Sequence, residues 1–174
     1  CPERGRRGIA MSSGRRIVEI PVEKKIERIL RTRQLTVTTA ESCTGGLIAG
    51  TLVNAPGISE VYKEGYITYS NEAKMKLLGV KEETLRKYGA VSRQTAIEMA
   101  EGAARAAGAI AVTGIAGPDG GTEEKPVGLV YIGCTVEGKT IVKRCFYGGD
   151  RMAIRQAATR EALDILYCQI LSSE

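Results

Sequence analysis

A single α/β domain with a mixed sheet is the fold class that the sequence predicts. The chain has 174 residues, which is the size of one ordinary domain. Strand-like segments alternate with helical segments, which favours parallel strands covered by helices. The last two strand segments are joined directly at Glu137-Gly-Lys139, which predicts a β-hairpin. We therefore expect a mixed, mostly parallel sheet covered by helices, with a C-terminal hairpin and a long final helix.

The first half of the chain predicts two strands among several helices. Val22, Ile26, Ile29 and Leu30 recur at helical spacing, which predicts an amphipathic helix. The β-branched run from Leu35 predicts a strand. The expected elements are, in order, a helix at 22–33, a strand at 35–39, a helix at 45–53, a strand at 65–69, helices at 72–78 and 81–88 that Asn71 and Gly79 help to delimit, and a longer helix from Ser92.

The second half predicts three strands and the final helix. The helix from Ser92 carries a largely alanine face, formed by Ala96, Ile97, Ala100, Ala103, Ala104 and Ala107. A buried-type strand follows at 109–113, and a glycine-rich loop occupies 114–126. Strands are expected at 127–136 and 139–147, and a helix at about 150–171, which turns these residues inward: Ile154, Ala158, Ala162, Ile165 and Leu166.

The composition narrows the possible chemistry, because the chain contains no histidine. Ser-His-Asp and Cys-His nucleophile pairs are therefore excluded, and so is every zinc site that needs an imidazole ligand. If the protein activates a nucleophile, the base has to be lysine, tyrosine or a carboxylate.

Charge and cysteine usage bear on partners and location. Residues 1–16 carry five arginines against one glutamate, which is +4 of the net +5, so the body is nearly neutral. With no Trp and one Phe, the sequence does not predict a stacking platform for nucleic acid. The five irregularly spaced cysteines, without a C-x-x-C pair, indicate a reducing compartment, and we expect the cytoplasm. No apolar run reaches the length of a membrane span.

The first candidate site is the strand-to-helix turn that contains Ser42. Unpaired N–H groups at a helix start can face an anion or a developing oxyanion, and Gly45 and Gly46 allow close approach to the backbone. A serine before a helix is more often only an N-cap. Cys43, beside Ser42, is a rival nucleophile.

The second candidate is Lys74, which precedes Leu77 and Leu78 by three and four residues. On a helix it would lie near their apolar face, where lost hydration favours a neutral amine that can take a proton. The alternative is a lysine whose stem is buried and whose tip is solvated. Tyr69 is either a hydrogen-bonding partner or an ordinary strand residue.

Two further segments can bind an anion. The loop 114–126 has four glycines that permit tight backbone paths, so it is either a phosphate or carboxylate cradle or a mobile loop. Arg151 stands in the first turn of the last helix, where the helix dipole disfavours a cation. Anion binding would explain that position, and Asp150 before it is more simply an N-cap.

Five blocks in this order resemble the CinA carboxy-terminal domain family. The blocks are Ala40-Glu-Ser-Cys-Thr-Gly-Gly46, Tyr69-Ser-Asn-Glu-Ala-Lys74, Gly89-Ala-Val-Ser92, Thr113-Gly-Ile-Ala-Gly-Pro118 and Lys125-Pro-Val-Gly128. The resemblance runs from about residue 23 to about residue 171. It implies a domain at 21–174, and residues 1–20 are expected to be a disordered or non-native extension.

The resemblance implies a metal-free and cofactor-free amidase that converts nicotinamide mononucleotide to nicotinate mononucleotide and ammonia, in pyridine-nucleotide recycling. By the same resemblance Ser42 is the nucleophile, with Lys74 and Tyr69 as its activating partners. Substrate contacts are expected at Thr44, Gly45, Gly46, Thr113, Gly114 and Arg151. The resemblance also implies a homodimer or larger homo-oligomer. The open alternative is a nucleotide-binding module of the same fold without catalysis.

Overall fold

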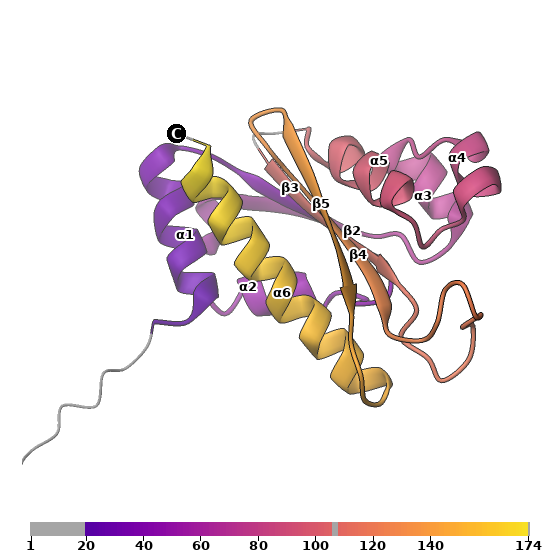
Figure 1. The fold of residues 1–174 in the computed structure, drawn as a ribbon. Coiled ribbons are helices and arrows are strands. Elements are labelled where there is room, and N and C mark those ends of the chain that lie inside the picture. Colours follow the sequence, from indigo (N-terminus) through magenta and orange to yellow (C-terminus); the bar gives the residue numbers. More distant parts are fainter. Residues whose placement is uncertain (1–19, 106–107, 174) are drawn as a thin grey trace, which may run out of the picture.

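The computed structural model describes residues 20–105 and 108–173, and these form a sheet between two layers of helices (Figure 1). The extension expected at 1–20 lies, except for Ile20, outside the described residues. The helices are α1 Val22–Arg33, α2 Leu47–Leu52, η1 Ile58–Glu60, α3 Asn71–Leu78, α4 Glu82–Tyr88, α5 Arg93–Ala103 and α6 Arg151–Ser172. The strands are β1 Val37–Glu41, β2 Tyr62–Ile67, β3 Gly108–Gly114, β4 Leu129–Val136 and β5 Lys139–Phe146.

The five strands lie in the order β2-β1-β3-β4-β5. β1 pairs in parallel with both β2 and β3, whereas β4 is antiparallel to β3 and to β5. The β4–β5 turn has positive φ at Glu137 (49°) and Gly138 (80°), as a two-residue hairpin turn requires. The predicted class is confirmed: one α/β domain with a mixed sheet, a C-terminal hairpin and a long final helix.

The two faces of the sheet bury side chains of different size. Ile110 and Val112 of β3 pack in the core under α1, α2 and α6, while Ala109 and Ala111 pack in the core under α3, α4 and α5. β3 is buried on both faces, which explains its continuous apolar run. Small side chains on one face let α5 approach the sheet closely, so that a methyl group at Gly133 would meet the Ala96 carbonyl oxygen at 2.4 Å.

The first two strands are shifted from their predicted positions for local reasons. The strand predicted at 35–39 is Val37–Glu41, because Leu35 still belongs to the end of α1. Gln34 adopts a left-handed conformation, and the Leu35 N–H bonds to the Leu30 carbonyl at 2.9 Å. The strand predicted at 65–69 is Tyr62–Ile67, where parallel pairing with β1 begins at Val37. The short helix η1 was not predicted.

The topology brings three strand ends to one edge of the sheet. β2, β1 and β3 are parallel neighbours, so Thr68, Ser42 and Ile115 follow strands that end side by side. The connection after β1 runs through α2 on one face, and the connection after β2 returns through α3, α4 and α5 on the other (Figure 1). Open α/β sheets bind ligands in such a crevice, beyond the carboxyl ends of the strands.

Two helical glycines provide a test of the packing that positions α3. A methyl group added at Gly102 of α5 would meet the Leu78 carbonyl oxygen at 1.8 Å, whereas one at Gly50 of α2 would meet nothing within 4 Å. We expect Gly102→Ala to lower the free energy of unfolding by about 1–3 kcal/mol. Gly50→Ala should raise it by about 0.5–1 kcal/mol, since alanine favours a helix. Urea unfolding measures both changes in the free energy of unfolding, and changes of the same sign in the two variants would contradict this packing.

Candidate active site

Ser42 is the first residue after β1, and the sheet fixes its backbone. Its N–H donates to the Val112 carbonyl of β3 at 3.0 Å, and the Thr68 N–H donates to the Glu41 carbonyl at 2.8 Å. These bonds continue the parallel pairing one step past the last residue of β1. Ser42 is 8% exposed, so its hydroxyl lies in a buried setting on a rigid part of the molecule.

Lys74 reaches Ser42 from α3 across 32 residues of sequence. Its Nζ lies 3.1 Å from Ser42 Oγ and 2.8 Å from the Thr68 carbonyl oxygen, with the Tyr69 carbonyl oxygen at 3.5 Å. Lys74 is only 1% exposed. The helical phase of Lys74 with Leu78 therefore buries the whole lysine side chain and not only its stem.

The surroundings of the pair favour a neutral amine beside a hydroxyl. Burial lowers the pKa of Lys74, and within the described ranges no carboxylate lies in salt-bridge distance of its amine. Burial raises the pKa of Cys43 to about 11, so the neighbouring thiol keeps its proton at neutral pH. A protonated thiol is a poor nucleophile, which weakens the case for Cys43.

The sequence led us to expect that the N–H groups at the start of α2 face the site. In the structure they do not. The buried carboxylate of Glu41 accepts from Gly46 N (2.9 Å), Ile48 N (3.1 Å) and Ala49 N (2.8 Å). The Gly45 N–H donates to the Ser42 carbonyl at 3.1 Å. Glu41 thus replaces a side-chain cap that Gly46, the N-cap residue, lacks. Gly45 and Gly46 have their N–H groups engaged within the chain.

The next two N–H groups toward Ser42 are not bonded to the rest of the described chain. In the part of the chain that the structure describes, the amides of Cys43 and Thr44 donate to no other residue. The carbonyls of the same residues accept from Arg155 of α6, a residue that the sequence reasoning missed. Its distance from Ser42 in the sequence left no local signal that could have found it.

A cavity of about 260 Å³ opens beside the Ser42–Lys74 pair. It is lined by Ser42, Cys43, Tyr69, Lys74, Ala90, Val91, Thr113, Gly114, Ile115, Ala116, Gly117, Asp119, Gly120 and Arg151. Seven of the residues named from the sequence therefore line it, counting Cys43, and Thr44, Gly45 and Gly46 do not. The Thr113 hydroxyl donates to the Ala90 carbonyl at 2.8 Å, which ties the end of β3 to the segment before α5.

Tyr69 and Arg151 meet at the outer part of this cavity. The Arg151 guanidinium donates to the Tyr69 phenol oxygen and to the Gly117 carbonyl, both at 2.7 Å. The Tyr69 side chain is 60% exposed, and only its carbonyl lies near Lys74. The structure therefore places the Tyr69 hydroxyl with Arg151 and gives Lys74 a direct path to Ser42.

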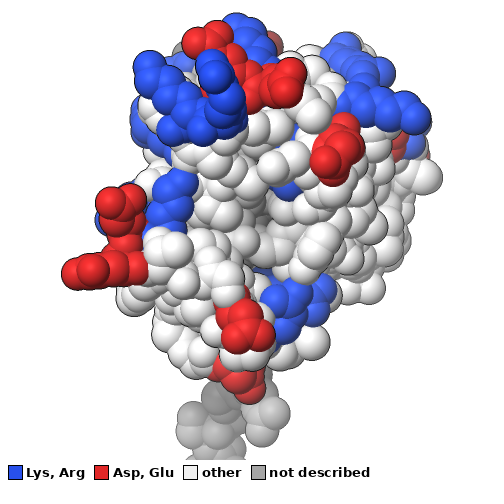
Figure 2. Space-filling view, turned by 90° about the vertical axis from the view of Figure 1, so that its right-hand side faces the viewer, with Lys and Arg blue, Asp and Glu red and all other residues white. Residues whose placement is uncertain are grey.

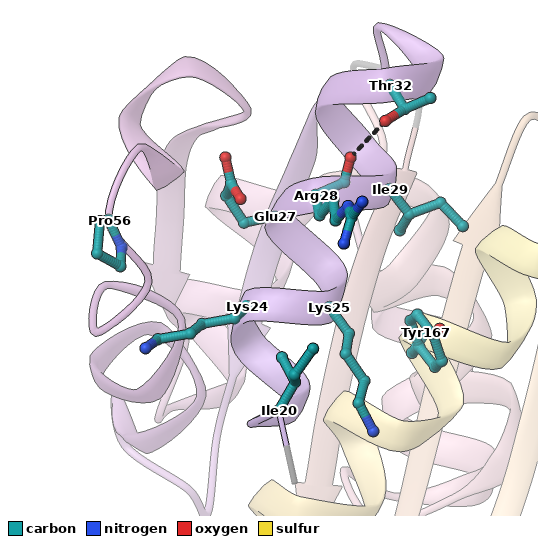
Figure 3. Close-up of a pocket in the computed structure, with 9 residues that line it drawn as sticks. All are labelled: Ile20, Lys24, Lys25, Glu27, Arg28, Ile29, Thr32, Pro56 and Tyr167. Carbon is teal, nitrogen blue, oxygen red and sulfur yellow. Dashed lines mark hydrogen bonds between the residues drawn. The ribbon is translucent and has the colours of Figure 1, made fainter. Parts of the chain in front are cut away.

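A larger cavity, of about 750 Å³, lies elsewhere on the outer side of α1, next to Tyr167 of α6 (Figure 3). Its charged lining consists of Lys24, Lys25, Arg28 and Glu27, and the two lysines extend from α1 in different directions (Figure 3). No hydroxyl there lies next to a buried base. In the smaller cavity, by contrast, the Ser42 hydroxyl is in contact with the buried Lys74 amine.

Charge on the face that carries α3, α4 and α5 is interspersed (Figure 2). Lysine, arginine and acidic side chains mix along its upper part, and much of the centre is uncharged (Figure 2). The described atoms of this face do not form the continuous basic stripe that nucleic acid would need.

The described residues contain neither a metal-binding cluster nor a membrane-spanning helix. No group of three or more Cys, Asp or Glu side chains there has a metal-binding arrangement. Likewise, none of the described helices combines the length and apolar character needed to cross a bilayer.

The state of Cys43 can be tested by alkylation. We expect iodoacetamide at about pH 7 to label the exposed Cys168 in the native protein and to leave Cys43 unlabelled, since the thiolate is the reactive form. Mass spectrometry of tryptic peptides would show the extent of labelling at each cysteine, and unfolding in urea should make the two extents equal. Equal labelling of both cysteines in the native state would contradict the assignment of Cys43 as a buried thiol.

The sequence and the fold both have relatives. Residues 19–170 match the family described as the CinA C-terminal domain. A CinA-like protein of Kosmotoga olearia is 58% identical over 151 residues, which are 85% of this chain and 37% of that protein. The chain thus spans well under half the length of the curated relatives it matches.

Solved structures agree over almost their whole length. The competence/damage inducible protein CihA from Agrobacterium tumefaciens superposes with a TM-score of 0.81 at 48% identity, covering 87% of this chain and 96% of that one. The competence damage-inducible protein A (ComA) from Klebsiella pneumoniae superposes with a TM-score of 0.84 at 37% identity, covering 88% and 97%. With the sequence match and the shared fold in agreement, this chain belongs to the CinA C-terminal domain family.

Proposed function

We propose that this chain hydrolyses the carboxamide of nicotinamide mononucleotide to nicotinate mononucleotide and ammonia, with Ser42 as nucleophile and Lys74 as base. The observation that carries the proposal is the 3.1 Å contact between Ser42 Oγ and the buried Lys74 amine. This contact supports acyl transfer from an amide. The choice of amide follows from the resemblance to the CinA family.

The hydrogen-bonding groups of a neutral Lys74 amine match those of its three neighbours. It has two N–H donors and one lone pair. The carbonyls of Thr68 and Tyr69 can accept the two N–H groups, and the lone pair then accepts the Ser42 hydroxyl proton. A protonated amine would have no lone pair to offer. The lowered pKa of Lys74 favours the neutral form that can act as the base.

The reaction then proceeds in two acyl-transfer steps. Ser42 Oγ attacks the carboxamide carbon while its proton passes to Lys74, and the carbonyl oxygen becomes an oxyanion. The C–N bond breaks as the Lys74 ammonium returns that proton to the leaving nitrogen, which departs as ammonia. Water then attacks the Ser42 ester with Lys74 again as base, and the carboxylate product is released. The free N–H groups of Cys43 and Thr44 are the donors we assign to the oxyanion.

The outer cavity supplies groups for the rest of a nucleotide. Arg151 combines a fixed guanidinium with an exposed position, which suits a phosphate. Gly117 and Gly120 of the glycine-rich loop line the same cavity. We assign the phosphate to this side and the carboxamide to the Ser42 side. Tyr69 then orients Arg151, and Thr113 and Gly114 also line the cavity.

The nucleophile can be tested by ammonia release from nicotinamide mononucleotide without added metal. We expect Ser42→Ala to reduce turnover by at least about 10³-fold, because the acyl-enzyme can no longer form. Ser59→Ala, at an exposed position, should retain full activity as the matched control. Retained turnover in Ser42→Ala would remove Ser42 from the role. Nucleotide binding by calorimetry with no turnover in the unaltered chain would instead favour the non-catalytic binding module.

The base can be tested by the pH dependence of kcat/KM. Activity should fall as the pH drops through the pKa of Lys74, because only the neutral amine accepts a proton, and that pKa lies below its ordinary value of 10.5. Lys74→Ala should lower kcat by at least about 10²-fold. Lys76→Ala, an exposed lysine of the same helix, should behave like the unaltered chain. A normal profile in Lys74→Ala would assign the base to another group.

A further inference from the structure

Two charged side chains hydrogen-bond to the turn after Ser42 from opposite sides of its peptide groups, one to N–H groups and one to carbonyls. On one side the Glu41 carboxylate holds the N–H groups of Gly46, Ile48 and Ala49. On the other, Arg155 of α6 donates from Nε to the Cys43 carbonyl at 2.9 Å and from Nη2 to the Thr44 carbonyl at 2.8 Å. One guanidinium therefore holds two successive peptide groups.

Because a peptide unit is planar, fixing its carbonyl also fixes the direction of its N–H group. In a trans peptide the N–H points opposite to the carbonyl of the same unit. Because the Cys43 carbonyl points at Arg155, the Thr44 N–H points away from it. Because the Thr44 carbonyl also points at Arg155, the Gly45 N–H points away too, and it closes the turn onto the Ser42 carbonyl at 3.1 Å. A flipped peptide would present an oxygen where the reaction needs a donor.

We propose that Arg155 is a positioning residue that holds the Cys43–Thr44 and Thr44–Gly45 peptides so that the N–H of Thr44, together with that of Cys43, binds the oxyanion. Arg155 touches neither the cavity nor Ser42, so it acts through the backbone it orients. The inference rests on the proposed acyl transfer at Ser42. The Arg155 cation also polarises the Cys43 and Thr44 carbonyls, which strengthens the N–H donors of the same peptide units.

The surroundings of Arg155 fit this role better than that of an ordinary ion pair. No carboxylate in the described part of the chain lies within salt-bridge distance of its guanidinium. Gly45 adopts φ +58°, and a methyl group there would lie 3.3 Å from Arg155 Nη2. The backbone at 45 and the guanidinium are thus closely fitted. A lysine could reach one carbonyl but could not span both, because its ammonium lacks the planar fork.

Kinetics of folded variants test the role. We expect Arg155→Met to lower kcat for nicotinamide mononucleotide by about 10²-fold with KM nearly unchanged, since only the transition state carries the oxyanion. Arg155→Lys should be intermediate, and free guanidinium ion should partly restore Arg155→Met. Arg160→Met, an exposed arginine of the same helix, is the matched control. A merely structural role would reduce activity only in proportion to the unfolded fraction, measured by circular dichroism.

A second readout separates this inference from the choice of substrate. A fluorophosphonate probe should phosphonylate Ser42 without any nucleotide, and mass spectrometry gives the rate. We expect that rate to fall by at least about tenfold in folded Arg155→Met and to be unchanged in Arg160→Met. If the unaltered chain is phosphonylated but releases no ammonia, the proposed substrate is wrong and the role of Arg155 stands on the probe. Equal rates in Arg155→Met and the unaltered chain, or no reaction at Ser42 in either, would overturn the inference.

Discussion

The burial of the Lys74 amine is the constraint around which this domain is organised. A lysine at 1% exposure, with no carboxylate in the described structure to balance it, is costly as a cation. As a neutral amine it is satisfied by two carbonyls and one hydroxyl. The same burial lowers the pKa of the amine, which favours the neutral form with a free lone pair. Structure and proposed chemistry therefore depend on one desolvated group.

The fold supplies that burial through packing at a distance from the site. α3 carries Lys74, and the close contact of Gly102 in α5 with the end of α3 at Leu78 holds the helix against its layer. Alanines on the facing side of β3 let this layer lie close to the sheet. The amine thus reaches the end of β1 without entering solvent. Helix α3 and the end of β1, and not a flexible loop, set the distance between the Lys74 amine and the Ser42 hydroxyl.

Charges near Ser42 are divided between holding the backbone and facing the cavity. Glu41 and Arg155 engage the N–H and carbonyl groups of the turn, so the start of α2 is saturated from within the chain. Arg151, one turn before Arg155 on α6, faces the cavity instead. A single helix therefore places one guanidinium on the backbone of the turn and another at the cavity. Hydrogen bonds to Gly117 and Tyr69 give the Arg151 guanidinium partners in the first turn of α6, where the helix dipole disfavours a cation.

The sequence by itself determined the order and type of the main elements and the kind of base available. Hydrophobic periodicity located α1 and α6, the continuous apolar run located β3, and the lack of histidine left lysine, tyrosine or a carboxylate. Only the tertiary structure decided which groups meet. Lys74 is 32 residues from Ser42, and Arg155 is 112 residues from Cys43, so no local pattern records either contact. Local propensity also could not show that Glu41 occupies the N–H groups of α2, because that depends on where the neighbouring parallel strands end.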